Sequence, residues 1–130
     1  MAGKPVALTY SVAGVWMAEG KVLLGRRKPG GSMGGRWELP GGKCENGENE
    51  RQALAREFLE EFGLNIRVIE KLASTRFSNR GHPHEVTAYR IEASLPIPRL
   101  NEHDEVSWFT AHELPRDIVD SDAALLAKIL

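Results

Sequence analysis

One predicted helix, spanning about residues 49–62, constrains the fold more than any other feature of the sequence. Asn49 is suited to cap its first turn, with Gln52 three residues later, and Gly63 is typical of a helix end. At about 100° per residue, its apolar side chains form one stripe: Leu54, Ala55, Phe58, Leu59 and Phe62. A stripe of this kind has to be buried, so we expect the helix to pack against another layer of structure.

The segment before this helix favours strands. Residues 5–16 are rich in β-forming side chains, and Glu19-Gly20 is a turn signal that predicts a hairpin with residues 21–28. Residues 29–35 contain four glycines, which favours an irregular loop. A short strand is expected at 37–40, ending in a Pro-Gly-Gly bend.

Further strands and one more helix are expected after it. We predict strands at 66–74, 85–93 and 105–109, a polar loop with Arg80, Gly81 and Pro83, a helical turn at 112–114, and a final helix capped by Ser121. Strands on both sides of a central helix, closed by another helix, predict an α+β sandwich with a mixed sheet between helices. With 130 residues, the chain is expected to be a single domain over 1–130.

Composition narrows the classes of partner. The formal net charge of −1 argues against a general electrostatic grip on nucleic-acid polymers, so no stable partner of that kind is expected. A single cysteine, Cys44, excludes a disulfide framework within the chain. There is no run of roughly 20 apolar residues and no signal-peptide core, so we expect a cytoplasmic protein without a membrane partner.

Three glutamates lie close together on the predicted helix. Glu57, Glu60 and Glu61 fall within about 100° of one another, and the nearest cation is Arg56. Like charges at these spacings repel by about a few tenths of a kcal/mol per pair. On its own the pattern is typical of a solvated helix face, so its meaning depends on the surrounding sequence.

The surrounding sequence has a fixed spacing. From Gly42 it reads G-x5-E-x7-R-E-F-x-E-E-x-G-L, with Glu48, Arg56 and Gly63 at defined places besides the three helix glutamates. Seven identities at ordinary residue frequencies coincide by chance about once in 10⁸ starting points. The pattern resembles the box of the Nudix hydrolase family. WELPGG before it and a Glu–Trp strand after it are similar to that family too, so the resemblance covers most of the chain.

The resemblance implies metal-dependent hydrolysis of a pyrophosphate linkage. A divalent cation, Mg²⁺ or Mn²⁺, would neutralise phosphate oxygens and activate the attacking water. In the family, the matching metal ligands are the carbonyl of Gly41 and the side chains of Glu57, Glu60 and Glu61, with Glu57 and Glu61 the steadier ones. Arg56 and Glu48 match a pair that braces the loop against the helix.

The resemblance leaves the general base open. Glu102 lies six residues before Trp108, the spacing at which MutT-type members carry a further metal-binding or base glutamate. Asp104 and Glu105 compete for this role. His103 is expected at the surface.

Candidate substrate-binding residues also follow from the resemblance. Arg27 matches a substrate-contacting arginine on the second strand, whereas Arg26 would face the opposite way. Arg80 is a weaker candidate for binding phosphate. Asp122 stands where the MutT branch has a base-reading asparagine, and its alternative role is to cap the last helix beside Ser121.

The branch of the family is inferred from missing markers. Asn79 and Gly81 replace the proline and tyrosine that mark ADP-ribose and diadenosine polyphosphate hydrolases. The remaining resemblance is to MutT-like enzymes, which convert a canonical or modified nucleoside triphosphate to the monophosphate and pyrophosphate. A 5′ RNA pyrophosphohydrolase is the alternative, and a non-catalytic Nudix-fold ligand sensor is a more distant one. A monomer or homodimer is expected.

Overall fold

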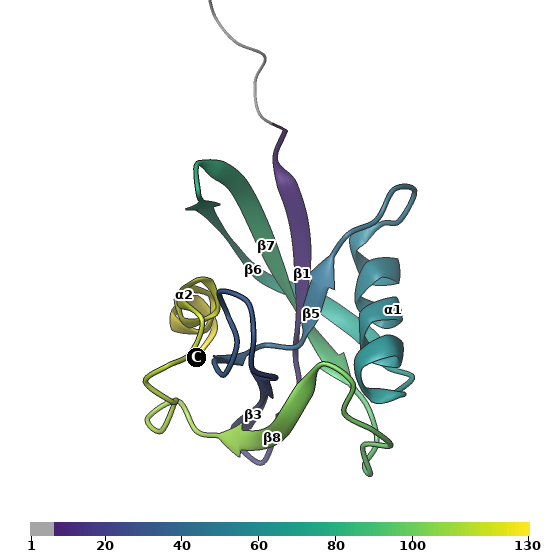
Figure 1. The fold of residues 1–130 in the computed structure, drawn as a ribbon. Helices are drawn as coiled ribbons and strands as arrows, with labels where there is room; N and C mark the ends of the chain where they lie inside the picture. The colour runs from purple at the N-terminus through teal and green to yellow at the C-terminus, as the bar shows by residue number, and fades with distance from the viewer. Residues whose placement is uncertain (1–6) are drawn as a thin grey trace, which may run out of the picture.

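The computed structural model describes residues 7–130, so the start of the strand expected at 5–16 lies outside the described residues. The elements in this part of the chain are β1 (Thr9–Val15), β2 (Met17–Ala18), β3 (Lys21–Arg27), β4 (Trp37–Glu38), β5 (Gly41–Lys43), α1 (Glu50–Phe62), β6 (Arg67–Asn79), β7 (His82–Glu92), β8 (His103–Phe109) and α2 (Asp120–Ile129). Figure 1 shows their arrangement.

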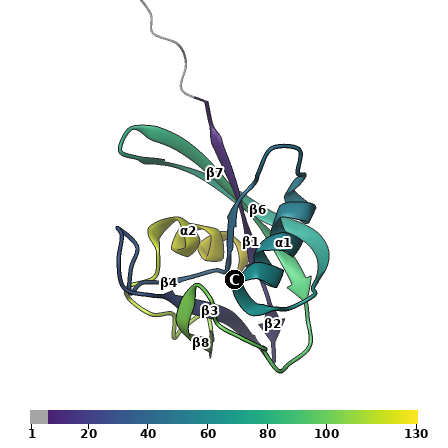
Figure 2. The ribbon, with the colours of Figure 1, turned by 45° about the vertical axis from the view of Figure 1, so that its right-hand side comes forward.

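The strands form two sheets. The first has the order β5-β1-β7-β6, with β1 parallel to β7 and antiparallel to β5. It lies between α1 and α2 (Figure 1). The second sheet joins β2, β3 and β4, with β8 paired to β3, and lies below the first in Figure 2. A mixed sheet between helices is therefore confirmed, and the second sheet is an addition to the prediction.

Strand β1 supplies side chains to the core on both faces of the first sheet. Val12, together with Trp16 directly after the strand, packs with the buried residues of α1, whereas Ala13 and Val15 pack with those of α2. Gly14 lies under Phe58, and a Cβ atom there would come within 2.4 Å of the ring. The alternation of a strand thus lets one segment hold both helices.

Both ends of α1 are as predicted, but its buried face is not. Asn49 and Gln52 form a reciprocal capping box, and Gly63 takes a left-handed conformation with φ of 70°. Ala55 and Leu59, expected in the apolar stripe, are exposed, so this part of the prediction is wrong. The buried face is rotated toward Glu61, and the helix therefore carries a carboxylate into the interior.

The polar loop expected around Arg80 is instead a tight turn. Strands β6 and β7 are longer than predicted, and Arg80 and Gly81 connect them with φ values of 52° and 77°. Both values lie in the region that two-residue hairpin turns require. Pro83 can lie in β7 because β7 pairs with β1 only from His84 onward. The missing N–H of Pro83 therefore leaves no gap in the ladder between β7 and β1.

Two predictions near the C-terminus are wrong. Helix α2 begins at Asp120 after Val119, and no side chain caps it, so Ser121 is not the cap. The backbone N–H of Val119 donates to the carbonyl of Trp37 at 2.8 Å, which fixes the chain just before the helix. The helical turn expected at 112–114 is only a hydrogen-bonded turn closed between Thr110 and Glu113. Across residues 7–130, the helices are too short or too polar to span a membrane.

Candidate active site

The Pro-Gly-Gly bend brings backbone directly against the acids of α1. Gly41 has φ of 157°, and a Cβ atom there would meet the carbonyl oxygen of Val12 at 2.0 Å. A Cβ atom on Gly42 would meet the carboxyl carbon of Glu57 at 2.5 Å. Both positions therefore require glycine, and the bend is held in place because β5 pairs with β1.

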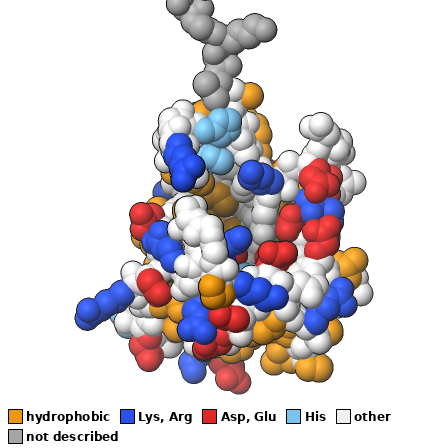
Figure 3. Space-filling model, viewed as in Figure 1, with side chains coloured by type: hydrophobic (Ala, Val, Ile, Leu, Met, Phe, Trp, Pro, Cys, Tyr) orange, Lys and Arg blue, Asp and Glu red, His pale blue; other side chains and the backbone are white. Residues whose placement is uncertain are grey.

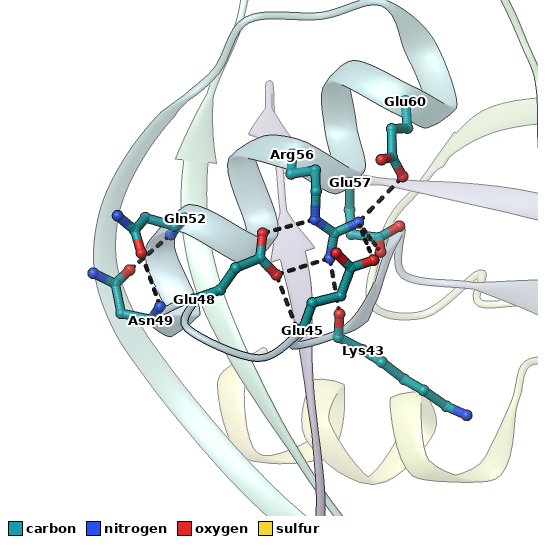
Figure 4. Close-up of polar contacts among 8 residues, drawn as sticks. All are labelled: Lys43, Glu45, Glu48, Asn49, Gln52, Arg56, Glu57 and Glu60. Carbon is teal, nitrogen blue, oxygen red and sulfur yellow. Dashed lines mark hydrogen bonds and ion pairs between the residues drawn. The ribbon is translucent and has the colours of Figure 1, made fainter.

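Arg56 is the centre of a network that joins the loop before α1 to the helix (Figure 4). Its guanidinium donates to both carboxylate oxygens of Glu48, at 2.7 and 3.0 Å, and to Glu57 at 2.9 Å. It also donates to Glu60 at 3.2 Å and to the carbonyl of Lys43 at 3.0 Å. The hydrogen bond with Glu48, more than any other contact, raises the pKa of Arg56 further above its usual value. The bracing pair expected from the sequence is thus formed.

The three helix glutamates differ in their exposure to solvent. The exposed fraction of the side chain is 59% for Glu60 and 17% for Glu57, and Glu61 is only 2% exposed as a residue. Burial raises the pKa of Glu57, against the opposing effect of Arg56. Burial, followed by the charges of Glu38, Glu57 and Glu102, raises the pKa of Glu61 to about 9.

This donor set fits a hard divalent cation. Glu61 Oε2 is buried and has no hydrogen-bond partner among residues 7–130, although an unpaired buried carboxylate is costly. Glu57 lies beside the bend that supplies the Gly41 carbonyl. Oxygen ligands from carboxylates and a carbonyl are those that Mg²⁺ and Mn²⁺ prefer.

Sequence reasoning missed Glu38 and misplaced His103. Glu38, on β4, lies 2.9 Å from Nε2 of His103 and 3.4 Å from Nη1 of Arg27. His103 is fully buried, so the expectation of a surface residue is wrong. Its ring is stacked on Phe62, and Gly25 on the paired strand β3 leaves room for it, since a Cβ atom there would meet the ring at 2.5 Å. A glycine inside a predicted strand, here Gly25, was the feature of the sequence that could have indicated a bulky group packed against that strand.

The loop before β8 places Glu102 near the helix acids. Asn101 donates through its backbone N–H to the carbonyl of Glu61, at 2.9 Å, and through its side chain to that of Glu60, at 2.6 Å. The charge of the next residue, Glu102, contributes to the raised pKa of Glu61. The competing candidates, Asp104 and Glu105, instead pair with Arg26 at 2.9 and 3.5 Å.

A cavity of about 230 Å³ adjoins these groups. Its wall includes the glycine bend and side chains from β3, β4, β6, β7 and α2, among them Arg27, Glu38, Phe77, Asn79, His84 and Asp122. Arg80 lies at the hairpin turn and does not contribute to this wall. In Figure 3, acidic side chains gather at the right of a central hollow, where α1 lies.

Asp122 faces this cavity from the first turn of α2. It is 7% exposed, and its carboxylate accepts a hydrogen bond from the backbone N–H of Leu39 at 3.0 Å. It makes no cap hydrogen bond to its own helix, so the alternative role as a cap is excluded. Burial, and next the charge of Glu38, raises the pKa of Asp122 to about 7.

Comparison with known proteins agrees with this geometry. The NUDIX domain family matches residues 7–129. The chain belongs to the Nudix family. It is 36% identical over 126 residues to a Mycobacterium tuberculosis protein with the provisional name 8-oxo-dGTP diphosphatase 2, covering 91% of this chain and 85% of that one. The resemblance predicted from the sequence is therefore confirmed, and a hydrolase is the expected kind of protein in this family.

Two further matches to this Nudix chain, one sequence and one solved structure, come from Escherichia coli. The CTP pyrophosphohydrolase of strain K12 is 33% identical over 120 residues, covering 92% of this chain and 89% of that one. The solution structure of the ORF135 protein aligns with a TM-score of 0.81 at 28% identity, covering 95% of this chain and 89% of that one.

The buried carboxylate of Glu61 leads to a prediction about stability. Its pKa is about 9 in the native protein and 4.5 when unperturbed, so between these pH values the native state binds more protons than the unfolded chain. The free energy of unfolding therefore falls as pH rises through this window. In chelator-treated protein, Glu61→Gln should raise the free energy of unfolding at pH 8 by at least about 1 kcal/mol, with little gain near pH 4.5. Denaturant unfolding at both pH values measures this.

Glu60→Gln is the matched control for this measurement. Glu60 is exposed, so its substitution should leave the pH dependence of unfolding as it is in the wild type. An equal or lower stability of Glu61→Gln at pH 8 would show that the carboxylate is not under electrostatic stress.

Proposed function

We propose that this Nudix hydrolase converts a nucleoside triphosphate to the monophosphate and pyrophosphate in a Mg²⁺-dependent reaction. The oxygen of water attacks the β-phosphorus, the bond from this phosphorus to the oxygen bridging the α-phosphorus breaks, and the nucleoside monophosphate leaves. Mn²⁺ is the alternative ion. The substrate is a small-molecule nucleotide, and localisation, oligomeric state and the single-domain organisation of 1–130 remain predictions from the sequence.

One observation carries the proposal: a single cavity joins two chemically different ends. At one end lies the Gly41-Gly42 bend beside Glu57, and at the other lies Asp122, a buried carboxyl suited to reading a nucleobase. Glu38 also lines this cavity, and its charge helps to raise the pKa of both Glu61 and Asp122. A molecule with a phosphate chain and a base matches this arrangement.

The residues divide the chemistry among them. We propose Glu57, Glu60 and Glu61, with the carbonyl of Gly41, as the metal ligands, and the cation supplies charge neutralisation and water activation when bound. Arg56 and Glu48 keep Glu57 and the loop in place. Arg27 presents a cation at the cavity wall for the phosphates, a role for which Arg80 is less well placed.

The names of the relatives support the class of substrate. One relative is a CTP pyrophosphohydrolase, and another is provisionally an 8-oxo-dGTP diphosphatase. Both names describe nucleoside triphosphates, one pyrimidine and one oxidised purine. The four glutamates of the box are all present here, which disfavours a non-catalytic ligand sensor.

The reaction is tested with a panel of substrates and isotopic water. Purified protein with Mg²⁺ is given CTP, UTP, GTP, 8-oxo-dGTP and a 5′-triphosphorylated RNA, in water enriched in ¹⁸O. We expect monophosphate and pyrophosphate, with ¹⁸O in the pyrophosphate because attack is at the β-phosphorus. Glu61→Gln should lose at least about a hundredfold in kcat, which shows that the activity belongs to this protein.

Three outcomes would overturn the proposal. Orthophosphate as the primary product, full activity with EDTA, or a preference for the RNA over every free nucleotide would each assign a different reaction or substrate.

Glu102 is proposed as the general base. Glu102→Gln should lower kcat at least about a hundredfold and abolish the acidic limb of the pH–rate profile, because an amide cannot take a proton from water. Asp104→Asn is the matched control, since Asp104 pairs with Arg26 at the exposed side of β8. If the acidic limb persists in Glu102→Gln and disappears in Asp104→Asn, the role belongs to Asp104.

Asp122 is proposed to read the base. With a pKa of about 7, its carboxylate is mostly ionised and accepts hydrogen bonds at pH 8, which favours the amine of cytosine over the carbonyl of uracil. We expect kcat/KM for CTP over UTP to be roughly tenfold at pH 8 and smaller at pH 6. Asp122→Asn should change the ranking and remove its pH dependence, whereas Ser121→Ala, also in the cavity wall, should not. A uniform loss across substrates would mean that Asp122 only supports the fold.

A further inference from the structure

Three possible metal ligands meet on the inner side of the helix acids. Glu38 comes from β4, Glu61 from α1 and His103 from β8, and one ligand atom from each lies within 4.8 Å of the other two. Two strands of the second sheet and helix α1 are therefore needed to assemble the group. Glu61 and His103 are fully or almost fully buried, and Glu38 reaches the cavity wall.

Two buried polar atoms of this group have no hydrogen-bond partner in the part of the chain that the structure describes. Among residues 7–130, the buried side-chain atoms without any partner are Glu61 Oε2 and His103 Nδ1, and both belong to this cluster. Its nearest cation, Arg27, reaches only Glu38, at 3.4 Å. The carboxylates of Glu38 and Glu61 thus lie close together, and among residues 7–130 Arg27, on Glu38, is the one arginine or lysine that pairs with either. A divalent cation would balance the negative charges of the two carboxylates, and the neutral imidazole of His103 would add no further charge.

The contact between His103 and Glu38 has the spacing of two ligands on one ion. Nε2 and Oε2 are 2.9 Å apart. Neighbouring ligands ~2.1 Å from an octahedral ion lie ~3 Å apart, so an ion could replace the shared proton with little movement. Gly25 leaves space for the ring and Phe62 stacks against it, so the imidazole is held at this place.

We propose that Glu38, Glu61 and His103 form a metal site with one nitrogen ligand, which takes a transition-metal ion such as Mn²⁺ or Co²⁺ in preference to Mg²⁺. Imidazole favours transition metals, whereas Mg²⁺ prefers oxygen ligands only. The ion enters through the cavity that Glu38 lines. The site shares Glu61 with the proposed function but depends on neither the substrate nor the reaction.

The test is spectroscopic and uses no nucleotide. Tag-free, full-length protein is stripped with a chelator and given less than one equivalent of Mn²⁺, and electron spin-echo modulation detects nitrogen bonded to the ion. We expect ¹⁴N modulation from an imidazole, changed to the ¹⁵N pattern when the protein is labelled with ¹⁵N-histidine. Co²⁺ titrated against the visible absorption should bind at least tenfold more weakly to His103→Gln, which keeps a polar group opposite Glu38.

His112→Gln is the matched control, because His112 is an exposed histidine outside the cluster and the same substitution there should leave the nitrogen signal unchanged. Absence of the histidine signal in wild-type protein overturns the site, as does a signal that survives in His103→Gln. The isotope experiment decides the matter even if His103→Gln fails to fold. Failure of the nucleotide assay with Mg²⁺ would leave this result untouched, so the two proposals fail separately.

Discussion

The burial of the Glu61 carboxylate is the constraint on which the rest of the structure depends. Helix α1 packs on β1 so closely that Gly14 is required beneath Phe58, and this contact sets which side of the helix turns inward. The inward side includes Glu61 beside Phe62 instead of the apolar Leu59, which is left in solvent. A purely stabilising design would have buried the leucine. The packing therefore gives up apolar burial to place an ionisable carboxyl inside, as is common at functional sites.

The positive charge near the helix acids is unevenly distributed. Arg56 neutralises Glu48 and Glu57 and touches Glu60, all toward the outside of the helix. Within residues 7–130 Glu61 has no such ion pair, and its neighbours Glu38, Glu57 and Glu102 are all acids. The network fixes the outer acids in place while leaving the inner one in need of a cation. Because Glu61 lacks a cation in the metal-free protein, the carboxylate that favours metal binding should also lower the free energy of unfolding there.

Local signals let the sequence predict α1, its caps and the hairpin at Glu19-Gly20, whereas the proposed metal ligands follow from the resemblance to the Nudix family. Asn49 and Gly63 act through hydrogen bonds within a few residues, so no tertiary information is needed to recognise them. The position of His103 depends on Gly25, which is far away in the sequence and meets it only through the pairing of β3 and β8. The buried face of α1 likewise depends on β1. Asp122 was identified as a pocket residue from resemblance, but its bond to Leu39 needs the docking of α2 beside β4.

Strand β4 is only two residues long, yet Glu38 within it and Leu39 directly after it both line the cavity. Glu38 lies on this strand, and the N–H of the next residue, Leu39, holds Asp122. The carbonyl of Trp37, the residue before Glu38, accepts the hydrogen bond from Val119 that fixes the start of α2. A shift of β4 would thus move the carboxyl of Asp122 and that of Glu38, beside Glu61, together. Three consecutive residues, Trp37, Glu38 and Leu39, therefore fix Asp122 and the carboxylate beside Glu61 relative to each other.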